Sequence, residues 1–420
     1  MDDRRLPCHI HPVWPQRGRP PTRHPTGLRP PRRGYHALRR CLVRASARRK
    51  PRSADVKFPM IVDSHAHVFP PMGGPSGHPS AKEHLRYVQH TIMTHHQPVR
   101  RVSDNVAVTQ QTLFDGEDTA LDAMYDVDFR GGGYGKLAWT SGGVDYLKQY
   151  LPPSMRDLES TPEYIIAQMD YAGIDRAVIQ SGHLYGRLNA YIADAVRWYP
   201  DRFWGLALVD EWNIDDPSEA RSLDASINEL GLHALWFNTG SLEMHRSDTP
   251  VDDPVFFPFW ERVRTLGIPV FWNVTTSVPG QDAYLAQLAA LKRWLQIYPD
   301  IPCVLTHGLT VARFMEDGVA KIPEAAWEAI DTPNVISELL FPIFQGAVFD
   351  YPFREVRPII REYYERLGPK RLCWGSDLPN VERHATYRQS LAYLRDYCDF
   401  IPQDDMDAIL GGNITALFGT

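Results

Sequence analysis

Cysteine is scarce in this sequence, with only 5 in 420 residues. The three that follow Met60 are Cys303, Cys373 and Cys398, and they have no metal-type spacing. A disulfide framework or a cysteine-based metal centre is therefore not expected, and each thiol is interpreted as a small buried hydrophobic group. This usage is typical of a cytoplasmic protein in a reducing compartment.

Long apolar runs and phosphate-binding loops are absent as well. No stretch approaches about 18 continuous apolar residues and there is no secretory apolar region, so we expect no membrane partner. The glycine run "RGGGYG" at residues 130–135 matches neither GxGxxG nor the P-loop pattern, and we interpret it as a flexible loop.

Acidic residues are nearly missing from residues 1–59. This segment holds about 16 of the 45 Lys and Arg but only about 3 of the 51 Asp and Glu. Its arginine–proline composition lacks the apolar periodicity that would offset the entropy of ordering, so we expect disorder. The alternatives are a transit peptide, a nucleic-acid-binding arm without a recognition fold, or a gene-model artefact upstream of translation from Met60.

Residues 60–420 alternate between short apolar runs and helical patterns. The runs are continuous, which is typical of strands buried on both faces of a parallel sheet. Eight strands are predicted, at residues 60–65, 176–181, 203–210, 233–238, 268–273, 301–307, 334–340 and 371–377. Eight such strands, each followed by a helix, predict the α/β class and a (β/α)8 TIM barrel, with its chemistry at the C-terminal strand ends.

Two of the intervening helices have clear end signals. The helix expected over 161–173 has Pro162 at its start and Gly173 at its end. The helix expected over 282–299 has Asp282 as its N-cap.

An insertion interrupts the rhythm between the first and second strands. It spans about residues 70–160 and is rich in Gly, Pro, His and aromatic residues. An insertion after a barrel strand lies on the catalytic face, so we expect a lid or a substrate-shaping element, with a homodimer contact as a further option.

Four polar residues fall at matching strand ends. His65 and His67 stand two apart at the end of the first strand, so their side chains point the same way and can converge on one ion. His307 ends the sixth strand and Asp377 ends the eighth, so all four would lie around one barrel mouth. Any one of them alone would be interpreted as structural, but together they favour a metal or catalytic site for zinc or manganese.

Four stretches, "IVDSHAHVFP", "LTHG", "WGSDLP" and "ILGGNITALFG", together resemble the amidohydrolase-related family. This branch of the metal-dependent hydrolases contains aminocarboxymuconate semialdehyde decarboxylase, resorcylate-type decarboxylases and several hydrolases. The resemblance covers residues 60–420 apart from much of the insertion. It implies one divalent metal, zinc or manganese, held by His65, His67 and Asp377. It also implies that Asp377 handles protons and that His307 polarises or protonates the substrate.

The fifth strand departs from the family's pattern. A ligand histidine is expected after "PV" and two apolar residues, but this sequence has "PVFWN", so Asn273 stands there. An amide oxygen is a weak zinc ligand compared with imidazole, so metal affinity should fall unless another side chain substitutes. His183 and Glu338 are candidates for that substitution or for a substrate contact, and loss of the metal is the alternative.

The resemblance implies an enzyme, and two reactions fit the residues. In non-oxidative decarboxylation of an aromatic or enol carboxylic acid, Asp377 and His307 deliver a proton to the carbon that loses carbon dioxide. In hydrolysis of a lactone, ester or amide, with or without metal, Asp377 takes a proton from water and His307 stabilises the oxyanion. Trp236 and Trp272 favour a cyclic or aromatic carboxylate as the small-molecule substrate. We favour decarboxylation by family analogy, and a non-catalytic binding protein on a decayed barrel is the third option.

Overall fold

The computed structural model describes residues 59–419 apart from 94, 110, 115, 117, 341 and 343–345. The segment for which disorder is expected, residues 1–59, therefore lies outside the described residues except for Pro59.

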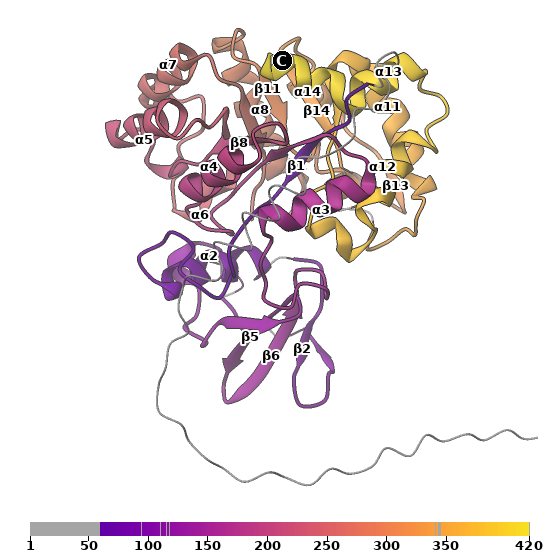
Figure 1. The fold of residues 1–420 in the computed structure, drawn as a ribbon. Helices are drawn as coiled ribbons and strands as arrows, with labels where there is room; N and C mark the ends of the chain where they lie inside the picture. The colour runs from indigo at the N-terminus through magenta and orange to yellow at the C-terminus, as the bar shows by residue number, and fades with distance from the viewer. Residues whose placement is uncertain are drawn as a thin grey trace, which may run out of the picture. The chain divides into compact units, whose positions relative to one another are not determined.

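Eight parallel strands form the central sheet (Figure 1). They are β1 (Val62–Ala66), β7 (Arg176–Ile179), β8 (Phe203–Ala207), β9 (Ala234–Asn238), β10 (Val270–Asn273), β11 (Cys303–Leu305), β14 (Val335–Leu339) and β15 (Leu372–Trp374). Each pairs with the next in this order. The chain after β15 returns to β1, because Ala66 and Leu378 form a parallel bridge and the His67 amide donates to the Leu378 carbonyl at 2.8 Å. The predicted (β/α)8 barrel is confirmed.

Apolar side chains on one face of the strands fill the barrel. They form a separate buried cluster that includes Val62, Val178, Trp204, Leu206, Phe271 and Val304. The opposite face packs under the helices in a larger core. Burial on both faces explains why the strands read as continuous apolar runs. Cys303, Cys373 and Cys398 are buried and unpaired, in line with the prediction.

Helices follow the barrel strands and cover them (Figure 1). They are α3 (Pro162–Ala172), α4 (Asn189–Trp198), α5 (Pro217–Asn228), α6 (Gly240–Met244), α7 (Phe257–Leu266), α8 (Gln281–Ile297), α9 (Glu324–Ile330), α11 (Arg357–Leu367), α12 (Tyr387–Arg395), α13 (Gln403–Asp407) and α14 (Asn413–Phe418). Among the described residues, none of the helices is both long and apolar enough to cross a membrane.

The predicted helix ends are correct for α3 and wrong for the start of α8. Thr161 caps α3 by accepting from the Tyr164 amide, and Gly173 ends it in the left-handed region at φ 81°. In α8 the N-cap is Gly280, and Asp282 lies in the first turn. The N-cap at Gly280, with a φ of 92°, lies two residues earlier than expected, and Asp282 interacts with the helix dipole instead of capping.

The insertion folds into a helix and an antiparallel sheet. The helix is α2 (Ala81–Met93), and the strands, in sheet order, are β3 (Ala107–Val108), β2 (Val99–Arg101), β6 (Val144–Gln149), β5 (Lys136–Ser141) and β4 (Arg130–Gly133). A two-stranded sheet, β12 (Met315–Glu316) with β13 (Val319–Ala320), lies elsewhere in the chain.

The glycine run belongs to this sheet, so its interpretation as a flexible loop is wrong. β4 pairs with β5 through a two-residue turn, in which Tyr134 and Gly135 have φ values of 53° and 75°. Positive φ at both positions is the signature of the tight hairpin turn that matches strand twist. Glycine is needed because a Cβ at Gly135 would lie 2.1 Å from the Leu151 carbonyl oxygen.

Candidate active site

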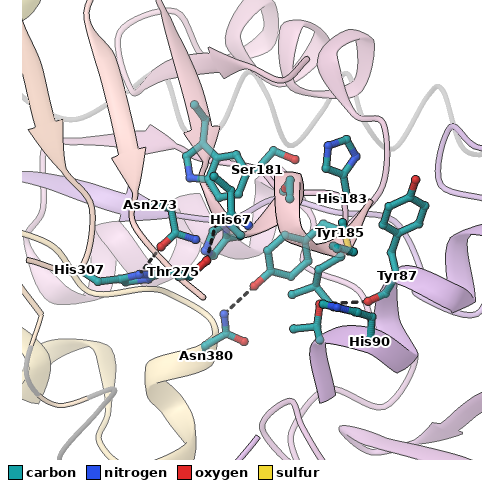
Figure 2. Close-up of a pocket in the computed structure, with 18 of the residues that line it drawn as sticks. His67, Tyr87, His90, Ser181, His183, Tyr185, Asn273, Thr275, His307 and Asn380 are labelled. Atoms are coloured by element: carbon teal, nitrogen blue, oxygen red, sulfur yellow. Dashed lines mark hydrogen bonds between the residues drawn. The ribbon is translucent and has the colours of Figure 1, made fainter. Parts of the chain in front are cut away.

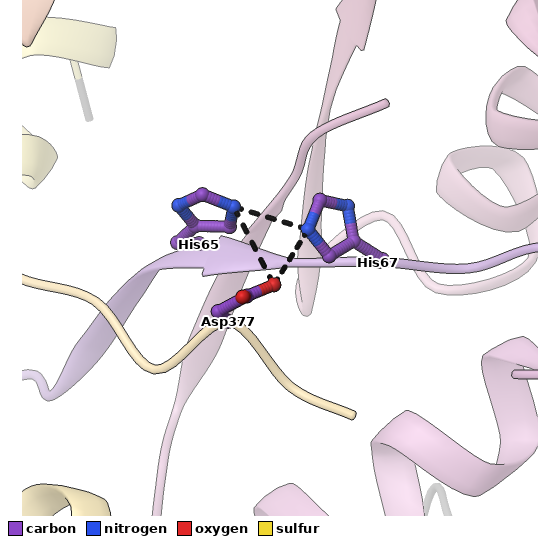
Figure 3. Close-up of side chains that lie close together, drawn as sticks. All are labelled: His65, His67 and Asp377. Carbon is purple, nitrogen blue, oxygen red and sulfur yellow. Dashed lines mark hydrogen bonds and ion pairs between the residues drawn. The ribbon is translucent and has the colours of Figure 1, made fainter. Parts of the chain in front are cut away.

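His65, His67 and Asp377 converge at the mouth of the barrel (Figure 3). The Nε2 atoms of the two histidines are 3.0 Å apart. Asp377 Oδ1 lies 2.9 Å from His67 Nε2 and 3.8 Å from His65 Nε2. All three side chains are buried, so the carboxylate and the imidazoles meet away from bulk water.

Neighbouring groups fix the tautomers of both histidines. His65 Nδ1 is 3.0 Å from Glu338 Oε2, and His67 Nδ1 is 3.0 Å from the Gln180 carbonyl oxygen. Since a carboxylate and a carbonyl only accept, each Nδ1 carries the hydrogen and each Nε2 presents a lone pair. Three acceptor atoms therefore face one another, an arrangement that fits a divalent cation and matches the outer contacts of metal-bound histidines.

A shift in strand register aims the first-strand histidines at the mouth. The pairing of β1 with β7 is irregular between Asp63 and Ala66, and bulges of this kind redirect side chains near active sites. Asp63 holds this segment, because its carboxylate accepts from the amides of His65 at 3.0 Å and Ser376 at 2.9 Å. The same carboxylate accepts from the Tyr387 hydroxyl at 2.8 Å, which links β1 to the chain that carries Asp377.

His307 lies beside the three acceptor atoms. Its ring stacks on that of His65 with centroids 4.7 Å apart, and its Nδ1 is 3.2 Å from Asn273 Oδ1. Its amide donates to Glu338 Oε2 at 2.8 Å. Both His307 and Asp377 have left-handed backbones, with φ of 67° and 61°. Such strain in non-glycine residues is typical of functional sites.

Burial and neighbouring charges shift the pKa values of the titratable groups in the site in different directions. Burial raises the pKa of Asp377, but the contact with His67 and the positive charge of the histidines when they are protonated outweigh it and hold the pKa well below its usual range. Burial lowers the pKa of His307 to about 4, and the charge of His65 adds to this effect. Burial also lowers the pKa of His65, but the charge of Glu338 reverses the balance and raises it.

These residues open into a cavity of about 320 Å³ (Figure 2). The barrel supplies His65, His67, Asn273, His307 and Asp377. Helix α2 of the insertion supplies Tyr87, His90, Thr91 and Met93. The volume lies at the lower end of the usual range for small-molecule sites, and part of its wall comes from the insertion.

The other predicted residues occupy different places. Asn273 ends β10 and lines the cavity, as do His183 and Trp236. His183 is hydrogen-bonded to Glu211 at 2.7 Å and is separate from the group formed by the three candidate ligands. Glu338 lies behind His65 as its hydrogen-bond partner. Trp272 packs into the core.

Trp272 is 1% exposed, and its indole ring packs against the rings of Phe237, Trp260 and Trp294. The aromatic character at this strand end therefore serves the packing between strands and helices. Its neighbour Asn273 points to the opposite face and reaches the cavity, as expected from the alternation of side chains along a strand.

Four residues near the ligands and one buried behind His183 were missed from the sequence. The Asn380 amide donates to Asp377 Oδ1 at 2.8 Å and to the Tyr185 hydroxyl at 2.7 Å. The backbone carbonyl oxygen of Gln180 contacts His67 Nδ1, and Arg383 lines the cavity. Glu211 is the partner of His183. Gln180 follows the apolar run of β7 directly, and Glu211 follows Asp210 at the end of the predicted strand 203–210, so both offered a signal like the one that singled out His307 and Asp377.

Part of the chain is similar to a known decarboxylase. γ-Resorcylate decarboxylase from Polaromonas sp. is 32% identical over 96 residues, which cover 22% of this chain and 28% of that enzyme. The match therefore spans less than a third of the curated relative.

Two solved structures are similar to this chain at low sequence identity. A dihydroxybenzoic acid decarboxylase from Polaromonas sp. with bound manganese is 18% identical, with coverage of 62% of this chain and 86% of that chain and a TM-score of 0.45. A probable 2-pyrone-4,6-dicarboxylic acid hydrolase from Acinetobacter baumannii is 19% identical, with coverage of 63% and 91% and a TM-score of 0.47.

The amidohydrolase family model matches residues 62–420, which include the whole barrel and the insertion. This match confirms the family resemblance drawn from the motifs. The chain belongs to the amidohydrolase family.

Proposed function

We propose that this protein is a metal-dependent enzyme that removes carbon dioxide from an aromatic carboxylic acid without oxidation. The observation that carries the proposal is the convergence of three buried acceptor atoms, His65 Nε2, His67 Nε2 and Asp377 Oδ1. The contacts of the two Nδ1 atoms fix the tautomers of both imidazoles. The 32% identity to γ-resorcylate decarboxylase over 96 residues supports decarboxylation over hydrolysis.

The donor set fits one divalent ion, zinc or manganese, held by His65, His67 and Asp377. When bound, the ion would supply positive charge for a substrate carboxylate and for the electron density that develops on the ring. His307 and Asn273 lie next to this position and are hydrogen-bonded to each other at 3.2 Å. Burial keeps the pKa of His307 near 4, so its ring is neutral at pH 7 and can hydrogen-bond the substrate without adding charge.

Asp377 is the proton carrier in this scheme. Its pKa is held low in the free site, so it begins as an acceptor. A substrate anion beside it raises that pKa, because two like charges disfavour each other, and Asp377 then takes up one proton. It passes the proton to the ring carbon that bears the carboxylate. The bond between that carbon and the carboxylate breaks, its electron pair returns to the ring, and carbon dioxide leaves.

The test begins with the metal content of protein expressed from Met60, measured by elemental analysis beside an Asn273→His variant. We expect about one zinc or manganese per chain in the parent. We expect the variant to bind the ion at least about tenfold more tightly, because imidazole is the better ligand.

The activity assay follows release of carbon dioxide from hydroxybenzoic acids by the loaded parent protein. Release that disappears on chelation and in Asp377→Asn supports the proposal. A loaded protein that cleaves lactones but releases no carbon dioxide would instead establish the hydrolase reaction. Turnover that is unchanged in Asp377→Asn would contradict the role of this residue in either reaction.

A further inference from the structure

The loop after β7 carries two buried polar atoms without hydrogen-bond partners among the described residues, and their side chains belong to residues that line the cavity. They are Ser181 Oγ and His183 Nδ1. Ser181 is 2% exposed and His183 is 4% exposed. Because unsatisfied buried polar atoms are rare and costly, two of them in one cavity wall point to a ligand group that satisfies them.

His183 lies away from His307 and Asn273 (Figure 2). Ser181 lies between His183 and Gln180 in the sequence, and the carbonyl oxygen of Gln180 contacts His67. Figure 2 shows His183 and Tyr87 on one side of Tyr185, and His307 and Asn273 on the other. A substrate that spans the cavity can therefore reach both sides at once.

Glu211 fixes the orientation of the His183 ring. Its Oε2 lies 2.7 Å from His183 Nε2, and its Oε1 accepts from the backbone amide of Asn238 at 3.1 Å. Glu211 is fully buried at the start of a short 3-10 helix, Glu211–Asn213, which three residues separate from the end of β8. A carboxylate only accepts, so Nε2 carries the hydrogen and Nδ1 is the atom left for a ligand. Trp212 packs against the His183 ring with centroids 4.8 Å apart.

The chemistry of the two atoms selects a hydroxyl group. A serine hydroxyl donates and accepts, and Nδ1 accepts in the neutral ring or donates in the charged ring. A ligand hydroxyl complements both atoms in either state. A carboxylate is disfavoured here because the Glu211 carboxylate is fully buried next to His183.

The wall beside these atoms suits a flat ring. Gly182 lies between Ser181 and His183, and a Cβ on it would come within 2.9 Å of the Trp236 indole. Trp236 therefore packs directly on the loop backbone and lines the cavity with its ring. Aromatic surfaces of this kind favour an aromatic ligand.

We infer that Ser181 and His183, oriented by Glu211, form a distal subsite that binds a ring hydroxyl of the substrate, remote from the carboxylate that leaves. The inference rests on the proposed function and narrows it to aromatic acids that carry a hydroxyl at the far side of the ring. His183 determines specificity, and Glu211 is its positioning residue.

Ligand binding tests the subsite directly. Metal-loaded protein is titrated with 2-hydroxybenzoate and with dihydroxybenzoates that carry the second hydroxyl on carbon 3, 4 or 5, and tryptophan fluorescence is recorded. We expect at least one dihydroxybenzoate to bind about fivefold or more tightly than 2-hydroxybenzoate. In His183→Gln, which keeps a donor for Glu211, this preference should fall to about twofold or less while the affinity for 2-hydroxybenzoate is retained.

His245→Gln is the matched control. His245 stacks on the same Trp212 ring, with centroids 3.4 Å apart, but does not belong to the described residues that line the cavity. Its substitution should leave the hydroxyl preference in place. Glu211→Gln should reduce the preference without weakening 2-hydroxybenzoate binding, because only the orientation of His183 changes. A merely structural role would weaken all the ligands alike.

The outcomes separate this inference from the proposed function. Equal affinity of the parent for the mono- and dihydroxybenzoates, or a preference retained in His183→Gln, would overturn the subsite. A His183-dependent preference without release of carbon dioxide would reject decarboxylation and keep the subsite. If no benzoate binds, the same comparison is made with resorcinol and phenol, and a parent that does not prefer resorcinol overturns the inference.

Discussion

The carboxylate of Glu338 joins four parts of the site. It accepts from His65 Nδ1 at 3.0 Å, from the His307 amide at 2.8 Å, from Ser64 Oγ at 2.8 Å and from Gln180 Nε2 at 3.0 Å. Burial raises its pKa, but the charge of His65 and these hydrogen bonds outweigh burial and lower it. Glu338 therefore stays ionised and increases the basicity of His65 without being a ligand itself.

Glu338→Gln should weaken metal binding although it removes no ligand. The amide NH₂ group would face a donor, and His65 would lose the negative charge that orients its ring. We expect the metal affinity to fall about 10–100-fold, as is usual when the outer partner of a metal-bound histidine is lost. Competition with a chromogenic chelator measures the change.

Glu243→Gln makes the same substitution at a carboxylate away from the three candidate ligands. Glu243 binds Thr276 Oγ1 at 2.8 Å and Gln287 Nε2 at 2.8 Å. The metal affinity of the Glu243→Gln variant should match that of the parent protein. Equal affinities in Glu338→Gln and the parent would show that the contact with His65 does not tune the site.

The sequence predicts residues at strand ends but not their distant partners. His65, His67, His307 and Asp377 follow apolar runs, and barrel topology then brings them together. The contact of His65 with Glu338 joins residues 273 positions apart, and only the register of the closed sheet decides it. The register shift in β1 has no sequence signal of its own, so the exact direction of the histidines could not be predicted.

Among the elements, the π-helical segment Ala408–Gly412 packs against the start of β1. A Cβ on Gly411 would lie 1.9 Å from the Met60 carbonyl oxygen and 3.1 Å from the Val62 amide nitrogen. Close packing therefore explains the first glycine of the pair in "ILGGNITALFG". At Gly411 the helix contacts the backbone of Met60 and Val62, which cannot move without shifting the histidines.

Gly411→Ala and Gly412→Ala should have opposite effects. The first forces the π-helical segment away from β1 and should lower the free energy of unfolding by about 1–3 kcal/mol. Gly412 has helical backbone angles, φ −56° and ψ −45°, and the nearest atom to its added Cβ is 3.5 Å away. Its substitution should be neutral or stabilising by up to about 1 kcal/mol.

Urea denaturation of the two variants and the parent measures these differences. Equal stability of Gly411→Ala and Gly412→Ala would show that the close approach to Met60 relaxes at no cost.

The elements of the barrel were predictable and those of the insertion were not. Barrel strands are apolar on both faces, so they stand out from the helices between them. Strand β5, "KLAWTS", alternates between buried and half-buried residues, and β4 contains three glycines. These strands are held by tight turns and by pairing within a small sheet, which a pattern of apolar runs does not detect.

At the scale of the whole molecule, partly or fully buried neutral histidines dominate the response of the stability to acid. Burial is the main cause that lowers the pKa of each, to about 2 for His95 and to about 4 for His78, His90, His245 and His384. Between these values and the ordinary pKa near 6.5, the unfolded chain binds more protons than the folded chain. Stability should therefore fall as the pH drops below about 6.5.

The pKa shift of Asp63 has the opposite effect on stability in acid. Burial raises its pKa to about 6, so the folded state holds a proton there between about pH 4 and 6 and gains stability in acid. The pKa values of His65, Glu219 and Glu382 are raised as well, but more histidines have lowered pKa values, so stability still falls with falling pH.

The measurement is the free energy of urea unfolding at pH 7.5, 6.5, 5.5 and 4.5, with chelator present so that loss of metal does not contribute. We expect a continuous decrease from the second point onward. A free energy that is constant from pH 7.5 to 5 would mean that these imidazoles are protonated in the folded state.

Closure of the barrel between β1 and the chain after β15 has a consequence for biosynthesis. Two of the proposed ligands lie in the first 67 residues and the third at Asp377, so most of the polypeptide must be made before they can meet. A ribosome-bound or truncated chain that has not yet formed β15 offers two histidines but no complete ligand set. Only the completed chain would thus bind zinc or manganese at this site, because incomplete chains lack the third ligand.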